Sequence, residues 1–191
     1  NRVMESEVVS SDHEELILVD SNDKITGNMT KLNCHLGNGL LHRAFSVFIF
    51  DGKGDVLLQQ RSNKKMLWPG YWSNACCSHP RTGESSKEAV YRRLEQELGI
   101  NAELTYLYKF EYHAQFNNVG CEHELCWVWI GVTDDAPINA NPNEIAEWRY
   151  LSQADLRDEL QTNPEIYTPW MKMEWQRITK DYLDFIPYQE Q

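Results

Sequence analysis

Two glutamates, Glu122 and Glu124, give the clearest chemical signal in this sequence. In an extended segment, side chains two residues apart share a face, so both carboxylates point the same way and His123 points away. Two carboxylates side by side in a half-buried place repel each other, and a cation, a shared proton or basic partners must neutralise them. Taken alone, the triplet favours the simpler alternative of a solvated strand end.

Three histidines near the ends of expected strands change that balance: His35, His42 and His79. Histidine nitrogens suit zinc, manganese or iron, and carboxylates also admit magnesium. Together with the two glutamates they could form a five-ligand cage for one divalent metal. Singly, each is more simply a surface or structural histidine. That interpretation is kept for three others: His13, His113 and His123.

The adjacent pair Cys76-Cys77 poses a second question. In an extended segment Cys77 shares a face with His79, whereas Cys76 points to the other side. A thiol near a metal and an imidazole can have a lowered pKa and act as acid, base or nucleophile. The alternative for Cys77 is a small buried apolar residue.

Basic and aromatic residues form a third group. Arg61, Lys64 and Lys65 precede Trp68-Pro69-Gly70, and further cations stand at Lys31, Arg92 and Arg93. Such a cluster in an acidic chain suits a phosphate or diphosphate. The alternative is ordinary solvation, which is the interpretation kept for Lys64. Trp170 could face a cation, and Tyr112 could hydrogen-bond a carboxylate across a sheet, although packing alone explains many such residues.

The elements that must position these residues follow from patterning. Ser85-x-x-Glu88 is a capping box that predicts a helix over 86–98, with Val90, Leu94 and Leu98 on one face and Gly99 as its stop. Further helices are expected from Ser152 to 160 and from 169 to about 184, and residues 31–43 as a loop. Strands are expected at 16–19, 44–50, 56–60, 72–79 (short), 104–113, 122–132 and 148–151. This order predicts a single mixed α/β domain, with residues 1–13 as a loose lead-in.

Composition limits the function classes. The 191 residues carry 18 Lys and Arg against 29 Asp and Glu, a net charge of −11, which disfavours nucleic acid and anionic membrane surfaces as partners. The five cysteines include no C-x-x-C pair, which predicts a reducing, cytoplasmic location. We find no signal peptide and no apolar run near the roughly 18 residues that a membrane span needs. We expect a monomer, because no exposed apolar stripe is evident.

With these residues assembled, the sequence resembles the type 1 isopentenyl-diphosphate isomerases from about Glu15 to Trp170. The resemblance rests on an ordered set of motifs: His35 with Leu-Leu-His42-Arg-Ala-Phe, Gln60-Arg61 with Trp68-Pro69-Gly70, Asn74-Ala-Cys-Cys77-Ser-His79-Pro, Arg92-Arg93 through Glu97-Leu-Gly99, Glu122-His-Glu124, and Thr168-Pro-Trp170-Met.

The resemblance implies a Nudix-like mixed β-sheet flanked by helices, with an N-terminal extension. The Nudix pattern G-x5-E-x7-R-E-U-x-E-E-x-G-U lies over residues 78–100 and matches at Glu84, Arg92, Glu97 and Gly99. It departs at three positions: Ser78, Arg93 and Gln96. Two metal-binding glutamates of the Nudix hydrolases are thereby lost, which disfavours diphosphate hydrolysis.

The roles of individual residues are implied by the same resemblance. It implies one tightly bound divalent metal (manganese, zinc or magnesium) on His35, His42, His79, Glu122 and Glu124. It implies a magnesium ion that accompanies the substrate, on Glu97 and the Cys77 carbonyl. Cys77 and Glu124 resemble the catalytic pair, Tyr112 the residue that assists the glutamate, and Trp170 the wall that faces a carbocation. Lys31, Arg61, Lys65 and Arg93 resemble the diphosphate contacts.

The implied reaction converts isopentenyl diphosphate into dimethylallyl diphosphate. It protonates an alkene on one face and removes a proton on the other, and a closed site must keep water from the tertiary carbocation. The N-terminal segment and the last helix are the expected lids. Two alternatives stand beside it: a Nudix pyrophosphohydrolase acting on a related diphosphate, and a non-enzymatic module that binds metal or diphosphate.

Overall fold

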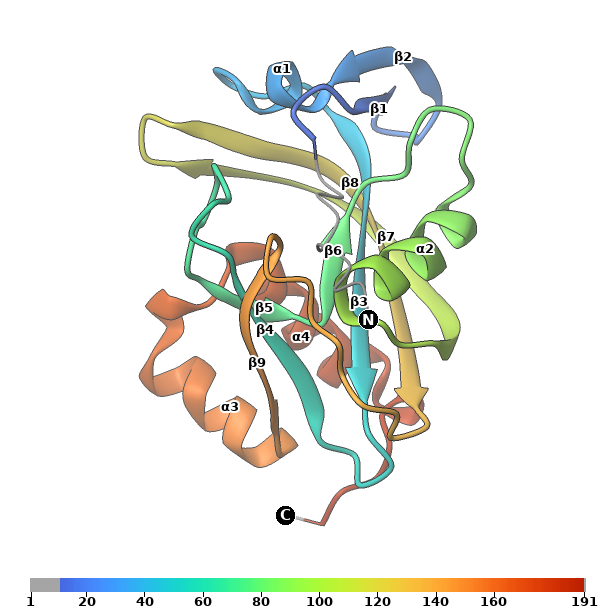
Figure 1. Cartoon of the computed structure of the whole chain (residues 1–191), viewed down its shortest axis with the longest axis vertical. Coiled ribbons are helices and arrows are strands. Elements are labelled where there is room, and N and C mark those ends of the chain that lie inside the picture. The colour runs from blue at the N-terminus through green and yellow to red at the C-terminus, as the bar shows by residue number, and fades with distance from the viewer. Residues whose placement is uncertain (1–10, 191) are drawn as a thin grey trace, which may run out of the picture.

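The computed structural model describes residues 11–190, which fold as a mixed β-sheet with helices on both faces (Figure 1). The strands are β1 (Glu15–Val19), β2 (Ile25–Thr30), β3 (His42–Phe50), β4 (Val56–Arg61), β5 (Trp72–Asn74), β6 (Cys76–Ser78), β7 (Ala102–Phe116), β8 (Gly120–Thr133) and β9 (Ile145–Leu151). The helices are α1 (Lys31–His35), α2 (Ser86–Leu98), α3 (Gln153–Thr162) and α4 (Pro169–Asp181), with 3-10 turns at Pro164–Ile166 and Leu183–Phe185. Among these helices, none is long and apolar enough to cross a membrane.

Strand β3 is the centre of the sheet. It pairs antiparallel with β1, β4 and β6 and parallel with β8. Phe45, Val47 and Ile49 pack into the core beneath α2, whereas Phe48 and Phe50 pack into the core beneath α3 and α4. A strand that is buried on both faces needs apolar residues at nearly every position, which explains the apolar run over residues 44–50, interrupted only by Ser46.

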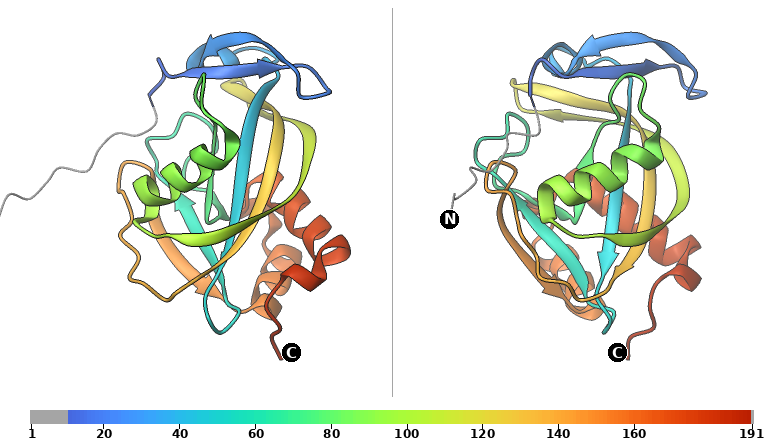
Figure 2. Two further views of the ribbon diagram at one scale, coloured as in Figure 1. Left: turned by 90° about the vertical axis from the view of Figure 1, so that its right-hand side faces the viewer. Right: turned by 45° about the vertical axis from the view of Figure 1, so that its right-hand side comes forward.

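Helix α2 forms where its capping box predicts. Ser85 Oγ accepts the Glu88 backbone N–H at 3.1 Å, and Gly99 ends the helix in the left-handed conformation at φ 64°. Val90 and Leu94 are fully buried against the sheet. Figure 2 shows α2 on one side of β3 and α4 on the other. The sheet is therefore held between the two helical layers, as a mixed sheet flanked by helices.

The structure corrects two parts of the sequence prediction. Residues 25–30 form the edge strand β2, whose mostly exposed and polar side chains leave no alternating pattern to detect. The stretch 31–43, expected as a loop, begins with the short helix α1, which Thr30 caps through the Asn33 N–H. Its five residues are too few for helix periodicity to appear in a sequence.

The N-terminal lead-in is described only in part. Residues 1–10 lie outside the described range, and so does the lid expected there. Residues 11–13 form a turn that is fixed to α1, because the Leu32 N–H donates to the Asp12 carbonyl at 3.1 Å. The last helix, expected as the second lid, is packed into the core through Met171 and Ile178.

Gly120 permits the close approach of β8 to α1. A Cβ built on Gly120 would collide with the carbonyl oxygen of His35 and meet Leu67 Cδ2 at 3.3 Å. We expect Gly120→Ala to lower the free energy of unfolding by about 1–3 kcal/mol, because backbone must shift to admit the methyl group. Urea denaturation measures the change. Gly27→Ala on β2 is the control: its new Cβ meets nothing closer than 4.0 Å, so we expect less than about 0.5 kcal/mol. Equal stability of the two variants would contradict the prediction.

Candidate active site

Three neighbouring strands bring the first candidate residues into one row. The parallel pairing of β3 with β8 sets His42 beside Glu124, and the antiparallel pairing of β7 with β8 sets Tyr112 on its other side. Because directly opposed residues share a face of the sheet, the three side chains meet. Tyr112 Oη donates a hydrogen bond to Glu124 Oε1.

Glu122 and Glu124 are nearly buried, at 7% and 6% exposed, and face the same histidine group. His79 Nε2 lies 3.1 Å from Glu124 Oε2, and His42 Nε2 lies 3.3 Å from the same oxygen. His35 Nδ1 lies 3.5 Å from Glu122 Oε2. Imidazoles thus surround the carboxylate pair and bring polar nitrogen atoms close to the buried carboxylates.

The group has the donor set and spacing of a metal site. Four residues have ligand atoms that all lie within 4.8 Å of one another: His42, His79, Glu122 and Glu124. The His35 ring adjoins them, 5.5 Å from the ring of His42 between centroids, while its Nδ1 also lies 3.3 Å from the Cys121 carbonyl. Among the described residues, His42 Nε2 and Glu122 Oε2 are buried without a partner in hydrogen-bonding geometry. A divalent cation in their midst would satisfy both atoms, so this buried His/Glu cluster can bind a metal.

The ionisation of the group also suits a metal. Burial lowers the pKa of His35 to about 3 and that of His79 to about 4, so both are neutral at pH 7. Burial alone would raise the pKa of Glu124, but the close contacts of its carboxylate with His42 and His79 outweigh it and bring the value to about 2. Burial lowers the pKa of His42 as well, yet its close contact with the Glu124 carboxylate outweighs burial and raises the pKa above its ordinary value. Neutral imidazole and ionised carboxylate are the forms that bind metal.

The two adjacent cysteines face opposite sides of the sheet. Cys77 pairs with Ser46 across β6 and β3 and lines a cavity together with His79, whereas Cys76 is buried beneath α2 and donates to Glu97 at 3.3 Å. Burial raises the pKa of the Cys77 thiol to about 12, and nearby Arg61 only partly opposes this. The lowered pKa that the sequence suggests is therefore wrong for the protein alone: the thiol is protonated at neutral pH.

Aromatic rings form one wall of the same region. Trp170, at the start of α4, stacks on Tyr112 with ring centroids 6.4 Å apart and meets Trp68 edge-on at 5.2 Å. The Arg61 guanidinium lies 5.3 Å from the centre of the Trp170 ring. Arg61 itself is fixed by donating to the carbonyls of Leu67 and Trp68. The wall is therefore rigid, and one face of the indole already holds a cation.

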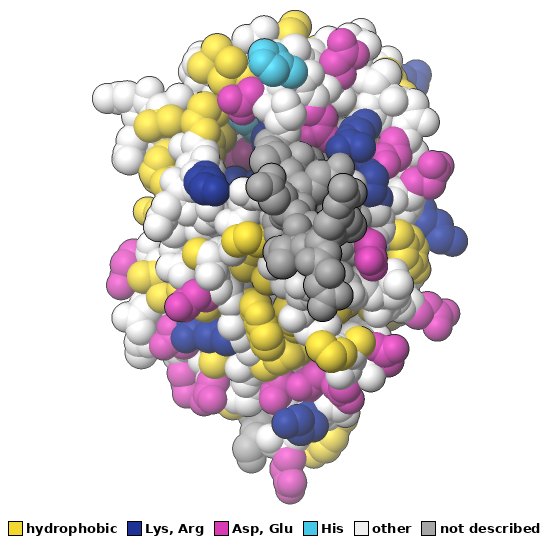
Figure 3. Space-filling model, viewed as in Figure 1, with side chains coloured by type: hydrophobic (Ala, Val, Ile, Leu, Met, Phe, Trp, Pro, Cys, Tyr) yellow, Lys and Arg dark blue, Asp and Glu magenta, His cyan; other side chains and the backbone are white. Residues whose placement is uncertain are grey.

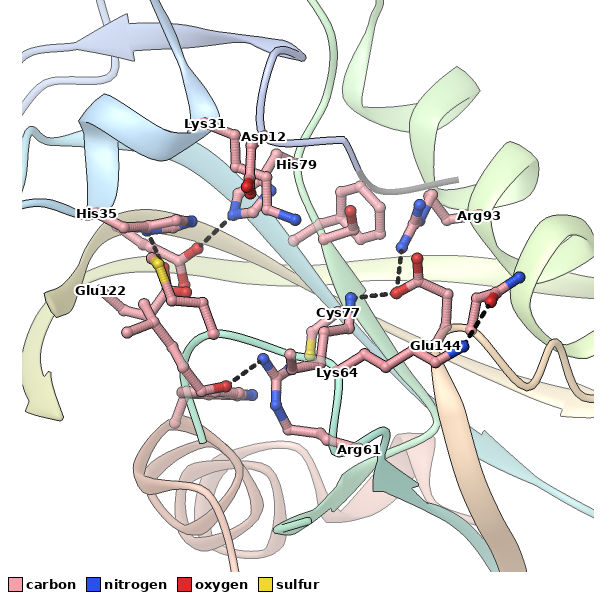
Figure 4. Close-up of a pocket in the computed structure, with 18 residues that line it drawn as sticks. Asp12, Lys31, His35, Arg61, Lys64, Cys77, His79, Arg93, Glu122 and Glu144 are labelled. Carbon is pink, nitrogen blue, oxygen red and sulfur yellow. Dashed lines mark hydrogen bonds and ion pairs between the residues drawn. The ribbon is translucent and has the colours of Figure 1, made fainter. Parts of the chain in front are cut away.

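A cavity of about 230 Å³ joins these parts (Figure 4). Its lining holds His35, His79, Glu122, Glu124, Cys77 and Trp170 together with five cations: Lys31, Arg61, Lys64, Lys65 and Arg93. Three predicted residues do not line the cavity themselves but contact residues that do. His42 and Tyr112 contact Glu124, and Glu97 contacts Arg93. On the face shown in Figure 3, acidic and basic side chains are interspersed.

The side chain of helix α2 that lines the cavity is the cation Arg93, and no row of carboxylates faces the cavity from this helix. Arg93 is 1% exposed, and its Nη2 lies 2.8 Å from Glu97 Oε2. Glu84 instead forms a 2.7 Å ion pair with Arg92, and Gln96 accepts a hydrogen bond from the same arginine. Of the Nudix-pattern acids that remain, only Glu97 is therefore held beside a residue that lines the cavity.

Sequence reasoning missed several residues of this site. Lys64, interpreted as solvated, lines the cavity and donates to Asn143 Oδ1 at 3.2 Å. Glu144 and Asn143 come from a loop whose sequence carries no motif, and Asp12 from the lead-in. The capping Thr30 ahead of Lys31 and His35 is the one signal that could have placed those two residues four apart on a helix.

Comparisons with known proteins agree with this geometry. The profile described as NUDIX domain matches residues 40–171. Isopentenyl-diphosphate Delta-isomerase 1 of Photorhabdus laumondii is 46% identical over 173 residues, which is 90% of this chain and 98% of the relative. Isopentenyl-diphosphate Delta-isomerase of Pectobacterium atrosepticum is 43% identical over 86% of this chain and 90% of its own length.

Solved structures show the same fold. A crystal structure of a Deinococcus radiodurans protein has a TM-score of 0.70 at 20% identity and covers 86% of this chain and 98% of its own. The MutT protein of Methanosarcina mazei has a TM-score of 0.60 at 19% identity, over 74% and 95% of the two chains. The fold, the matched profile and the close relatives together show that the chain belongs to the Nudix family and, within it, to the isopentenyl-diphosphate Delta-isomerases.

Proposed function

We propose that this chain isomerises isopentenyl diphosphate to dimethylallyl diphosphate. One observation carries the proposal: a thiol, Cys77, and a hydrogen-bonded carboxylate, Glu124, line one cavity whose walls also include an indole and five cations. The cations match a diphosphate, and the indole matches a carbocation. The relatives named above as isopentenyl-diphosphate Delta-isomerases support the same reaction.

The diphosphate would lie among Lys31, Arg61, Lys65 and Arg93, with Lys64 at the rim. Arg61 and Arg93 are held in place by protein acceptors, so they are oriented before the substrate arrives. Burial lowers the pKa of Lys31 to about 8, and Lys65 adds to the decrease. A phosphate oxygen beside Lys31 would raise this pKa again and stabilise the charged form, which ties this lysine to an anionic ligand.

The hydrocarbon end would then lie between Cys77 and Glu124. One of the two groups gives a proton to the terminal carbon of the alkene, and the other takes a proton from the methylene carbon that lies between the double bond and the carbon bearing the diphosphate. The C=C bond moves by one position, and the composition of the substrate does not change. The hydrogen bond from Tyr112 fixes the direction in which Glu124 presents its oxygen. Each group acts both ways, because the reverse reaction uses the same path.

The carbocation between the two proton transfers needs stabilisation and protection from water. Trp170 is 3% exposed and is held by Trp68 and Tyr112, so its ring can face the cation without rearrangement. Glu124 contributes a negative charge on the other side. The aromatic wall also leaves few polar groups that could hold a water molecule near the cation.

The buried His/Glu cluster would hold one divalent metal, with His35 as a fifth ligand beside the four that already converge. Bound there, a cation would neutralise Glu122 and Glu124 and polarise the carboxyl group that exchanges the proton. Zinc, manganese and magnesium all suit a mixed imidazole and carboxylate set. Glu97 and the Cys77 carbonyl would face a magnesium ion carried by the diphosphate. We further propose a cytoplasmic monomer, as the charge and cysteine content predict.

Hydrolysis of the diphosphate is the weaker candidate. A guanidinium, that of Arg93, occupies the helix position from which a hydrolase would offer a carboxylate, and it is ion-paired to Glu97. Glu84 is likewise held by Arg92 at 2.7 Å. A cluster of metal ions that activates water at this helix would need both carboxylates released.

We expect isopentenyl diphosphate, incubated with the metal-loaded protein and magnesium in D2O, to give the proton NMR signals of dimethylallyl diphosphate with deuterium incorporated. Inorganic phosphate and pyrophosphate should not appear, because no P–O bond breaks. Phosphate release without the shifted alkene would favour the hydrolase instead. Binding without any turnover would favour the non-enzymatic module.

Cys77→Ala and Glu124→Gln should each lower kcat by about 10²–10⁴-fold or more, because each removes one of the two proton-transfer groups. Initial rates measure the loss, while circular dichroism and metal analysis verify that the Cys77 variant is folded and loaded. Cys76→Ala is the matched control: its thiol faces α2, and we expect activity within about tenfold of the parent. Full activity of Cys77→Ala would contradict the proposed roles.

Metal binding should weaken as the pH falls. His35 and His79 are neutral at pH 7, but the raised pKa of His42 means that a proton competes with the metal there. Below that pKa, manganese affinity should fall by up to about tenfold per pH unit, and about one proton or less should leave per ion bound near neutral pH. Calorimetry in buffers of different ionisation enthalpy counts these protons. In Glu124→Gln the contact that raises the pKa of His42 is weaker, so the pH at which the manganese affinity begins to fall should be lower than in the parent protein. A manganese affinity that does not change with pH would refute the assignment of His42 as a ligand.

A further inference from the structure

Glu144 is a buried carboxylate on the diphosphate side of the cavity. It is 2% exposed and lies in the loop just before β9. Its backbone is fixed at both ends, because its carbonyl accepts the Ser62 N–H at 3.0 Å and its N–H donates to the Asn141 carbonyl at 3.0 Å. The side chain is therefore aimed into the cavity by a rigid backbone.

The carboxylate of Glu144 contacts cations that the substrate would use. Its Oε2 forms an ion pair with Lys65 Nζ and lies 3.7 Å from Arg93 Nη2 (Figure 4). Its charge also raises the pKa of Lys31 against the effect of burial. One carboxylate thus acts on three of the four cations assigned to the diphosphate.

This arrangement has an electrostatic cost for an anionic ligand. Glu97 lies on the same Arg93 guanidinium, 2.8 Å from its Nη2, so two buried carboxylates share the cation cluster. A diphosphate that enters must approach both of them, and in a buried site the repulsion is poorly screened. A divalent cation that arrives with the diphosphate offsets this repulsion.

We propose that Glu144 is an internal counter-ion of the diphosphate cations and makes diphosphate binding depend on magnesium. In the substrate-free protein it holds Lys65 and Arg93 in place and neutralises them. When magnesium diphosphate binds, Glu144 keeps the lysine oriented while the magnesium charge compensates the carboxylate. This inference rests on the proposed diphosphate site and adds to it a residue that selects the metal-complexed form over the free anion.

Inorganic pyrophosphate is the probe, because it reports on the anion site without turnover. Calorimetry would compare its affinity with and without magnesium, the latter in the presence of a chelator, for the parent protein and Glu144→Gln. We expect the variant to bind metal-free pyrophosphate about tenfold more tightly, with a change of about threefold or less for magnesium pyrophosphate. Glu147→Gln, an exposed position on the adjoining strand β9, is the control for loss of one negative charge and should change neither affinity.

A second pair of variants guards against loss of folding, since breaking a buried ion pair can be strongly destabilising. Lys65→Met with Glu144→Gln removes both charges of the pair. Compared with Lys65→Met alone, the double variant should again bind metal-free pyrophosphate more tightly. Thermal unfolding of each variant verifies the fold before the titrations.

Each other outcome overturns the inference in a recognisable way. Loss of affinity for magnesium pyrophosphate alone would make Glu144 a magnesium ligand. An equal loss for both forms would make it purely structural. An unchanged ratio of the two affinities would remove any role in selection. If the parent protein binds neither form, the proposed diphosphate site fails together with the inference.

Discussion

The burial of two carboxylates side by side on one strand is the constraint on which the rest of the site depends. Glu122 and Glu124 are almost removed from water, where an unpaired carboxylate is very costly. Imidazoles and a phenol approach from the neighbouring strands and supply hydrogen bonds, yet three buried atoms of this group still lack a hydrogen-bond partner: His42 Nε2, His79 Nδ1 and Glu122 Oε2. A cation bound among these atoms would complete the arrangement, so metal binding would serve the structure as well as the chemistry.

In the opposite half of the cavity the crowded charges are positive. There an excess of basic side chains must stay close together in a protein whose net charge is negative. Glu97 and Glu144 hold the Arg93 guanidinium between them, and backbone carbonyls hold Arg61. One half of the cavity thus holds buried carboxylates, and the other holds cations that two carboxylates and backbone carbonyls keep in place. The substrate has the complementary charges: its anionic diphosphate matches the cations, and its carbon skeleton, which becomes cationic, matches the carboxylates.

Much of this could be predicted from the sequence where a local pattern fixes a local structure. The capping box and Gly99 set the bounds of α2, and the i, i+2 spacing put Glu122 and Glu124 on one face. What could not be predicted depends on contacts between distant segments. The pairing of β3 with β8, the short helix under His35, and the loop carrying Glu144 have no local signature. The pKa of Cys77 could not be predicted from the sequence either, since it depends on how completely the fold buries the thiol. The single-domain organisation, the monomeric state and the roles of individual residues stay predictions.

The parallel register between β3 and β8 has a consequence for how the protein acquires its site. Parallel strands cannot be joined by a tight turn, and here the whole of β4 to β7 lies between them in the chain. Contacts of such long sequence separation form late, after the entropy of closing a large loop has been lost. Glu124 reaches His42 only when this pairing has formed, so the cluster can bind a metal only after it. Metal binding would thereby stabilise the completed sheet, because the ion would bind chains in which β3 and β8 are paired and not those in which they are still apart.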